Sequence, residues 1–339
     1  MLLSRFRYAD GIAPNMLALS YLVLAYAGGI FLLISAPWPG QLIGTLMVAH
    51  SLILSSYFLH EFAHNSIFKS AIDNRRAGIL MSWINGACYA SFDDLRYKHM
   101  RHHVDRADVI TFDYKAFLLR SPFWVRRWVL LLEWSYIPAV ELIMHGYVIL
   151  LPFISTEKKS HRNRVLSMVA LRLAAFITLG WVSPTGLIGY AIAYLIMLHV
   201  MRFADAYQHT YDAFAILQSG SIPDTKTRDH AYEQHNTYSN LVSVRHPILN
   251  LILLNFPYHN AHHERPVAPW HQLPQLHAKL FNSTYHQVLP MSTLLAAHHR
   301  YRVKRILSDN YGDVPAMPSG QLNPSAFYGA VGVSFLTAV

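Results

Sequence analysis

The chain has 339 residues, of which 53% are hydrophobic and 14% are charged, and its formal net charge is +9. Ordinary soluble domains carry about 25% charged residues, so this composition favours a membrane protein. So apolar a chain also argues against nucleic acid as a partner, and the basic charge instead suits anionic lipid or an acidic protein.

Four apolar stretches predict transmembrane helices, because each is close to the roughly 20 residues that cross a bilayer core. They lie at residues 17–36, 41–59, 165–182 and 184–203. The connections at 37–40 and 183–184 are short and uncharged, so the spans predict two tight hairpins. A second span follows the first almost at once and no clear cleavage site precedes it, so the first is not expected to be a signal peptide.

Lysine and arginine predict the orientation, because positively charged loops stay on the cytoplasmic side. The positive residues that flank the spans fall on one side, and they include Arg5, Arg7, Lys69, Arg75, Arg76, Arg96, Lys98, Arg101, Lys158, Lys159, Arg162, Arg164 and Arg202. We therefore expect both termini in the cytoplasm, with a cytosolic helical cap formed by about 60–164 and 204–325. Arg172, inside the third span, conflicts mildly with this topology unless it faces protein or snorkels.

Two further apolar segments are not expected to span the membrane. Trp128–Phe153 carries Glu133 and Glu141, and it predicts one or two helices that lie against the membrane face. The tail at 326–339 has only 14 residues. The chain therefore predicts one all-α integral-membrane domain, 1–339, with four transmembrane helices and a cap.

Histidine is unusually frequent, with 21 residues against 19 for aspartate plus glutamate. It is also the commonest metal ligand among side chains. The single cysteine, Cys88, excludes an intramolecular disulfide and a cysteine-ligated metal site in this chain.

Three motifs, H-E-F-A-H, K-H-M-R-H-H and Y-H-N-A-H-H-E, supply His60, His64, His99, His102, His103, His259, His262 and His263. Residues at i, i+3 and i+4 share a helix face, and eight imidazoles are more than one metal binds, so two metals are implied.

The motif H-E-F-A-H also matches the H-E-x-x-H pattern of zinc metalloproteases, in which Glu61 would be the general base. That interpretation leaves the other six histidines of the motifs without a role. In the two-metal interpretation, Glu61 is a candidate to orient an imidazole. A membrane protein that binds metal without catalysis is a further alternative.

The order and spacing of the motifs resemble those of the membrane fatty-acid desaturase family. His64 lies 35 residues before His99, and His103 lies 156 residues before His259, with the last two spans in that interval. The segment N-F-P-Y-H-N-A-H-H-E-R-P, followed by P-W-H-Q-L-P, resembles the third-motif region of bacterial members. The match covers about residues 40–280 and implies a four-helix stem with a cap that holds two metals, in a bacterial inner membrane.

The resemblance also implies a ninth ligand just beyond the fourth span, four residues after an asparagine. His209 matches that histidine, whereas Asp205 stands where asparagine is expected. Asp205 could bind metal directly or through water, and Glu264 after the third motif is another candidate to contact a ligand. The alternative for His209 is an interfacial histidine bonded to backbone.

The resemblance implies two iron ions, dioxygen as co-substrate, and a double bond introduced into a long-chain fatty acyl lipid or thioester. A related di-iron hydroxylase or ketolase, acting on a carotenoid, alkane or fatty acid, is the alternative that the histidines do not exclude. Arg96, Lys98 and Arg101 would suit a phosphate-bearing head group. Because the sequence has no dinucleotide fingerprint and no cysteine set for an iron–sulfur cluster, we expect an external electron donor such as an acidic ferredoxin-like protein.

Overall fold

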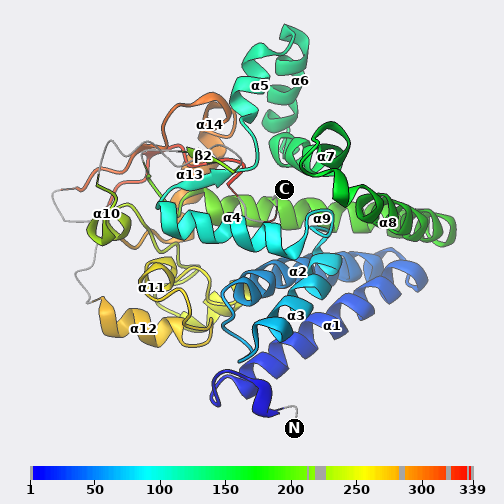
Figure 1. The fold of residues 1–339 in the computed structure, drawn as a ribbon, viewed down its shortest axis with the longest axis horizontal. Helices are drawn as coiled ribbons and strands as arrows, with labels where there is room; N and C mark the ends of the chain where they lie inside the picture. Colours follow the sequence, from blue (N-terminus) through cyan, green and yellow to red (C-terminus); the bar gives the residue numbers. More distant parts are fainter. Residues whose placement is uncertain are drawn as a thin grey trace. The chain divides into compact units, whose positions relative to one another are not determined.

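The structure is a computed structural model that describes residues 3–211, 214–217, 227–281, 287–317, 322–333 and 336. The chain divides into two compact units. Unit 1 runs to Asp94 and from His145 to Val200, and unit 2 comprises Leu95–Met144 and the chain from Met201 to Ala338. Helices dominate both units, which confirms the all-α prediction (Figure 1). Residues 212–213, 218–226, 282–286 and 318–321 of the expected cap lie outside the described residues.

Four helices among the described residues are long and apolar enough to cross a membrane, as predicted. They are α1 (Ile12–Ser35), α2 (Trp38–Ala63), the continuous segment formed by η2 (Lys159–His161) and α8 (Arg162–Val182), and α9 (Pro184–Ala206). The last turns of α9 belong to unit 2. Each helix is longer than the predicted range, because its backbone hydrogen bonds continue past the predicted apolar stretch, as in the polar residues that open the third segment at Lys159. In α2 this extension includes His60 and Glu61 of the first histidine motif, and His64 caps the C-terminus of the helix.

Small residues let the membrane-spanning candidates of unit 1 approach one another closely. A Cβ atom added to Gly29 of α1 would lie 3.0 Å from the carbonyl oxygen of Gly44 in α2. Ser183, which precedes α9, donates a hydrogen bond to the carbonyl of Leu33 at 2.9 Å. Close backbone approach through small residues is typical of helix packing in membranes.

The helix α8 exposes apolar side chains along most of its length, which is expected of a helix that faces lipid. Trp181 is 89% exposed, and Leu173 and Ile177 are exposed as well. Arg172 in the same helix does not project into solvent or lipid alone. Its guanidinium donates to the carbonyl of Trp83 in α3 (Ala71–Asn85) at 2.7 Å and lies 5.8 Å from the centre of the Phe176 ring. The charge therefore faces protein, which resolves the conflict in the topology.

The described residues of unit 2 form short helices and two small sheets. The helices α4 (Phe92–Asp105) and α7 (Ala139–Ile154) each have one end in unit 1. The other elements are β1 (Asp108–Ile110), α5 (Tyr114–Arg120), α6 (Phe123–Trp134), β2 (Phe214–Ile216), α10 (His230–His235), η3 (Pro247–Leu253), α11 (His259–Glu264), α12 (Leu273–Leu280), α13 (Met291–Arg300), α14 (Lys304–Leu307), β3 (Gly312–Asp313) and β4 (Ala326–Phe327). Strands β1 and β2 pair in parallel, and β3 and β4 pair antiparallel. The short helix η1 (Leu3–Arg5) opens unit 1.

The segment Trp128–Phe153 forms two helices, the end of α6 and most of α7, which is one of the two outcomes expected for it. Tyr136 between them has a left-handed backbone conformation, with φ at 62°. On α6, Trp124 and Trp128 are exposed whereas Glu133 is buried. An exposed aromatic face of this kind is typical of a helix at a membrane surface, and that position stays a prediction.

A buried ion-pair network ties three helices of unit 2 together. Arg202 of α9 donates from Nε to Glu141 Oε1 of α7 at 2.7 Å and from Nη2 to Glu133 Oε1 of α6 at 3.0 Å. Glu133 Oε1 also accepts from the backbone N–H of Val140 at 2.9 Å. All three charged side chains are buried, so removing the arginine would leave two desolvated carboxylates without a counter-charge.

We expect Arg202→Ala to lower the free energy of unfolding by about 3–5 kcal/mol, because breaking a buried ion pair leaves an uncompensated charge. Arg75→Ala is the matched control, since Arg75 donates to Asp93 at 2.7 Å on an exposed surface. An exposed pair contributes about 1 kcal/mol or less. Thermal unfolding in detergent measures both, and equal losses in the two variants would contradict the prediction.

Candidate metal centre

The second histidine motif lies on α4, whose start is capped by its own sequence. The Ser91 hydroxyl oxygen accepts a hydrogen bond from the Asp94 N–H at 3.0 Å, and acidic residues in the first turn favour the positive end of the helix dipole. His99, His102 and His103 follow on the later turns. Their spacing places the three imidazoles on neighbouring positions of one side of the helix.

The third histidine motif forms the buried helix α11. Leu254 and Asn255 turn the chain before it with left-handed backbone conformations, at φ 50° and 55°. The Asn260 amide donates to the carbonyl of Thr237 at 2.7 Å and accepts from the Ser239 hydroxyl at 3.0 Å. These bonds fix α11 beside the segment after α10 and so position its histidines.

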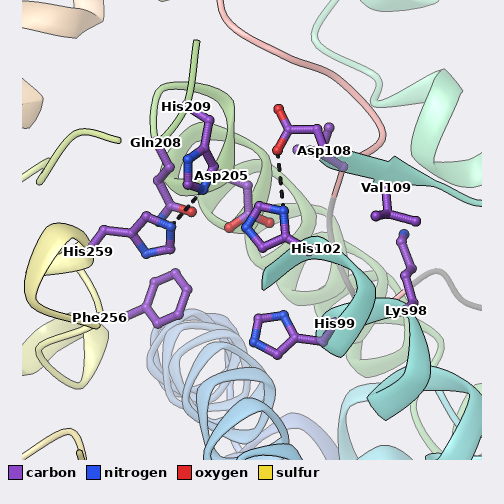
Figure 2. Close-up of a pocket in the computed structure, with 11 residues that line it drawn as sticks. Lys98, His99, His102, Asp108, Val109, Asp205, Gln208, His209, Phe256 and His259 are labelled. Carbon is purple, nitrogen blue, oxygen red and sulfur yellow. Dashed lines mark hydrogen bonds and ion pairs between the residues drawn. The ribbon is translucent and has the colours of Figure 1, made fainter. Parts of the chain in front are cut away.

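Four histidines from three segments of unit 2 bring their ring nitrogens together. They are His102, His209, His259 and His263, and their potential ligand atoms lie within 4.8 Å of one another. The Nε2 atom of His259 is 2.9 Å from that of His209 (Figure 2). It is 3.1 Å from the Nε2 atom of His263. Two nitrogens bound to one metal at about 2.1 Å and at right angles would be about 3.0 Å apart. We refer to these residues as the four-histidine cluster.

Hydrogen bonds to Nδ1 determine which ring nitrogens of the cluster carry protons. His102 Nδ1 is 2.9 Å from the carbonyl of Ala107, which only accepts, so Nδ1 carries the proton. His263 Nδ1 is 2.8 Å from Glu233 Oε1, and this carboxylate likewise accepts. The Nε2 atoms of both histidines are therefore unprotonated in the neutral ring.

The same logic applies to His209. The Thr237 hydroxyl donates its proton to the carbonyl of Glu233 at 2.7 Å, so it accepts from His209 Nδ1 at 3.2 Å. At least three Nε2 lone pairs in the four-histidine cluster then face a common space. Such lone pairs repel one another unless a cation lies between them, and metal-binding histidines characteristically donate their other N–H to a carboxylate or carbonyl. The donor set therefore fits a metal ion that prefers imidazole nitrogen.

A second group in unit 2 has the same character. His103 Nε2 lies 3.2 Å from His99 Nε2 and 3.2 Å from His262 Nε2. The rings of His103 and His263 are 4.4 Å apart between centroids, so this group adjoins the four-histidine cluster. The two groups could each hold a metal.

The first motif lies in unit 1 at the end of α2. His60 and His64 are buried, and their ring centroids are 4.7 Å apart. Glu61 Oε2 accepts from the Ser66 hydroxyl at 2.6 Å, and its Oε1 lies 3.7 Å from His60 Nδ1. Glu61 thus neighbours a motif histidine, and its role in orienting that imidazole stays a prediction.

The carboxylate that contacts the four-histidine cluster most directly is Glu233 of α10, which sequence reasoning missed. Its Oε1 accepts from His263, and its Oε2 accepts from Arg106 Nε at 2.9 Å. These hydrogen bonds and positive neighbours outweigh burial and lower the pKa of Glu233, so it is ionised at neutral pH. Glu264, the predicted candidate, instead accepts from the exposed His230 at 2.7 Å and is itself partly exposed.

A cavity of about 40 Å³ borders the cluster, and three charged side chains line it. Asp205, Asp108 and Lys98 line it together with His102 and His259 (Figure 2). Asp108 accepts from the Tyr311 hydroxyl at 2.6 Å, and burial raises the pKa of Asp108 to about 6. The cavity is large enough for an ion or a water-sized molecule and too small for an acyl chain.

Lys98 differs from its expected role. Its side chain is 1% exposed, and burial lowers its pKa to about 7 despite the nearby carboxylates of Asp205 and Asp108. The expectation that Lys98 meets a head group at the cap surface is therefore wrong. The sequence spacing of the basic residues could not show that the Lys98 side chain, next to His99 on α4, is buried.

Burial keeps the cluster histidines neutral. It lowers the pKa of His102 to about 4, and it lowers the pKa values of His209 and His259 well below 6.5, with repulsion from neighbouring imidazoles adding to the effect for these two. Neutral imidazole is the form that binds metal. At pH 7 these rings therefore need not release a proton from Nε2 before they can bind a metal.

We expect the metal-free protein to lose stability as the pH falls from about 6.5 to about 4. Unfolded histidine gains a proton near pH 6.5, whereas folded His102 does so only near pH 4, so the unfolded state binds more protons between these values. The stability is fully present above pH 6.5, and His102 alone accounts for about 3 kcal/mol of the loss. Unfolding midpoints of chelator-treated protein across this range, compared with His102→Gln, measure the effect. Identical profiles for the two proteins would refute it.

Comparison with known families adds an independent observation. Residues 36–295 match the fatty acid desaturase family. The chain belongs to this family. The match includes all three histidine motifs and His209, and it confirms the resemblance seen in the sequence, while the bacterial type stays a prediction. Family membership implies an oxidoreductase, and with the four apolar helices it indicates an integral membrane protein. None of the curated proteins compared matches the chain.

Proposed function

We propose that this desaturase family member uses dioxygen to introduce a double bond into a long-chain fatty acyl lipid or thioester. The observation that carries the proposal is the convergence of unprotonated Nε2 atoms in the four-histidine cluster. Histidines that are held neutral and buried by their surroundings suit a metal centre better than they suit packing alone. Family membership supports an acyl chain as substrate.

The proposal assigns nine histidines as ligands of two iron ions: His60, His64, His99, His102, His103, His209, His259, His262 and His263. The first two are included because of the family's motif order. Bound iron would supply the redox chemistry with dioxygen that removes hydrogen from an unactivated methylene, which zinc does not supply. The protein's own part is to keep the imidazoles unprotonated, oriented and shielded from bulk water. Glu233 orients His263 by accepting a hydrogen bond from its Nδ1–H, which leaves the lone pair of Nε2 directed at the cluster.

The overall reaction requires electrons from outside the chain. Loss of two hydrogens from the acyl chain supplies two electrons, and reduction of dioxygen to two waters consumes four. A donor must therefore supply two electrons, with two protons from solvent. An acidic ferredoxin-like protein suits the net charge of +9. Reconstitution with candidate donors tests this point, and turnover without any donor protein would refute it.

We also propose that the metal centre and both termini face the cytoplasm, of a bacterial cell by the resemblance of the third motif. The one-sided distribution of flanking Lys and Arg supports this orientation. Reporter fusions at the C-terminus test it. A reporter active only on the opposite side of the membrane would contradict it.

The decisive experiment compares the lipid profile of a host that expresses the chain with that of a His102→Ala, His262→Ala double variant. New unsaturated acyl chains that vanish in the variant would establish metal-dependent desaturation and reveal the double-bond position. His246→Ala is the matched control, because His246 is exposed and belongs to neither group of histidines. Oxygenated products in place of unsaturated ones would reassign the chain to the related hydroxylases.

A further inference from the structure

Unit 1 contains a second cavity, of about 530 Å³, in which none of the nine proposed ligands takes part. Residues of α1, α3, α8 and α9 line it, among them Tyr26, Ile34, Trp83, Phe176 and Tyr190. Its lining is mainly apolar. This volume is within the range of about 300–1,000 Å³ that is usual for sites that bind small organic molecules.

The cavity is accessible from the lipid-facing surface of unit 1. Three residues of its rim are exposed: Ile34 by 42%, Leu171 by 58% and Val182 by 56%. These residues belong to helices that are long and apolar enough to lie in the bilayer. A molecule dissolved in the membrane can therefore reach the cavity without crossing water.

Arg172 is the one arginine or lysine among the described residues that line this cavity. Its donors meet neutral groups: the carbonyl of Trp83 at 2.7 Å, the sulfur of Cys88 at 3.7 Å and the side chain of Tyr190. No carboxylate of the described residues forms an ion pair with it. The backbone carbonyl stabilises the guanidinium within the span but supplies no negative counter-charge, so an anion beside Arg172 is favoured.

The cavity is polar at one end of its α8 wall and apolar beyond. From Arg172 the lining continues along the same helix through Ala175, Leu179 and Val182. Ten residues of α-helix from Arg172 to Val182 rise about 15 Å. Because helical side chains point towards the N-terminus, the guanidinium lies towards the Arg162 end of α8 and the apolar wall extends away from it. This arrangement matches a molecule with an anionic head and an apolar tail.

We propose that this cavity binds one acyl chain from the bilayer, with its anionic head group, a carboxylate or a phosphate, held by Arg172. Carboxylate and phosphate share the geometry that a guanidinium recognises through paired N–H donors. The lipid site shares no residue with the proposed metal centre. Lipid binding to this cavity can therefore be measured without enzymatic turnover.

The test is titration of the purified full chain in detergent, followed by native mass spectrometry. The probes are palmitate, 1-palmitoyl lysophosphatidate and methyl palmitate, which has the same chain without the charge. We expect one of the two anions to bind at least about tenfold more tightly than methyl palmitate, and which one does so identifies the head group. Arg172→Met should reduce that anion's affinity to the level of methyl palmitate. Equal binding of all three probes to the unaltered protein would overturn the proposal.

A matched pair of variants on α8 separates this cavity from other lipid-binding surfaces. Ala175→Phe fills the cavity and keeps Arg172, whereas Ala170→Phe makes the same change at an exposed position that does not line it. Ala175→Phe should lose at least about tenfold in anion affinity, and Ala170→Phe should behave as the unaltered protein. Thr178→Phe narrows the same wall and repeats the test if Arg172→Met fails to fold. Equal affinities in Ala175→Phe and Ala170→Phe would overturn the proposal.

Discussion

His209→Ala is expected to bind about one iron per chain instead of about two and to lose desaturation by at least about a hundredfold. Residues that only orient a metal ligand already cost about 10–100-fold when changed, so loss of a ligand should reach or exceed that range. His209 is 3% exposed, and its Nε2 lies 2.9 Å from that of His259. Its Nδ1–H donates to the Thr237 hydroxyl, so Nε2 carries the lone pair and directs it at the other histidines of the cluster.

Metal content by elemental analysis and product yield in isolated membranes measure this result together. His246→Ala, at an exposed position, should match the unaltered protein in both. The variant must also elute as a monodisperse species, so that loss of iron is not loss of fold. Full iron content and full activity in His209→Ala would make this residue the interfacial histidine that its sequence position also allowed.

The membrane-spanning part of the fold could be predicted because lipid restricts the alternatives. Only about 20 consecutive apolar residues in a helix satisfy both the bilayer thickness and the backbone hydrogen bonds. The stretches at 17–36 and 184–203 met that condition, and α1 and α9 are found there. Helix ends were harder, because capping and tertiary contacts extend a helix past its apolar residues, as at His60 in α2.

The motif histidines were also recognisable, since helical spacing alone places His102 and His103 on adjoining faces of one helix. Spacing could not show which nitrogen carries the proton. That depends on acceptors distant in sequence, such as the Ala107 carbonyl for His102 and Glu233 for His263. Glu233 lies in the segment Y-E-Q-H-N, where His235 is the conspicuous residue, yet His235 is exposed.

Glu264 follows the third motif directly and was for that reason the expected partner of a ligand. On a short helix, however, its position next to His263 in sequence turns its carboxylate away from the ring, towards His230. Glu233 reaches His263 from another helix, α10, and sequence distance concealed it. A buried histidine ligand needs a hydrogen-bond acceptor for its second ring nitrogen. A search of the sequence for acidic residues that could supply this acceptor would have included Glu233.

Glu233→Gln is expected to weaken iron binding and lower desaturation by about 10–100-fold. The glutamine oxygen could still accept from His263 Nδ1, but its amide would place an N–H group against the Arg106 guanidinium, where the carboxylate now accepts. The variant also removes the negative charge that favours a positively charged metal centre beside the ring. Competition with a chelator gives the change in iron affinity, and the rate of double-bond formation gives the change in activity.

Glu264→Gln is the matched control, with the same chemical change close in sequence to the same histidine. Its carboxylate meets the exposed His230 ring, so we expect iron affinity and activity within about twofold of the unaltered protein. Unfolding of the chelator-treated variants measures the effect on the fold separately, because Glu233→Gln also loses the contact with Arg106. Equal losses of iron in Glu233→Gln and Glu264→Gln would show that the hydrogen bond to His263 does not orient the ligand, because only one of the two carboxylates makes it.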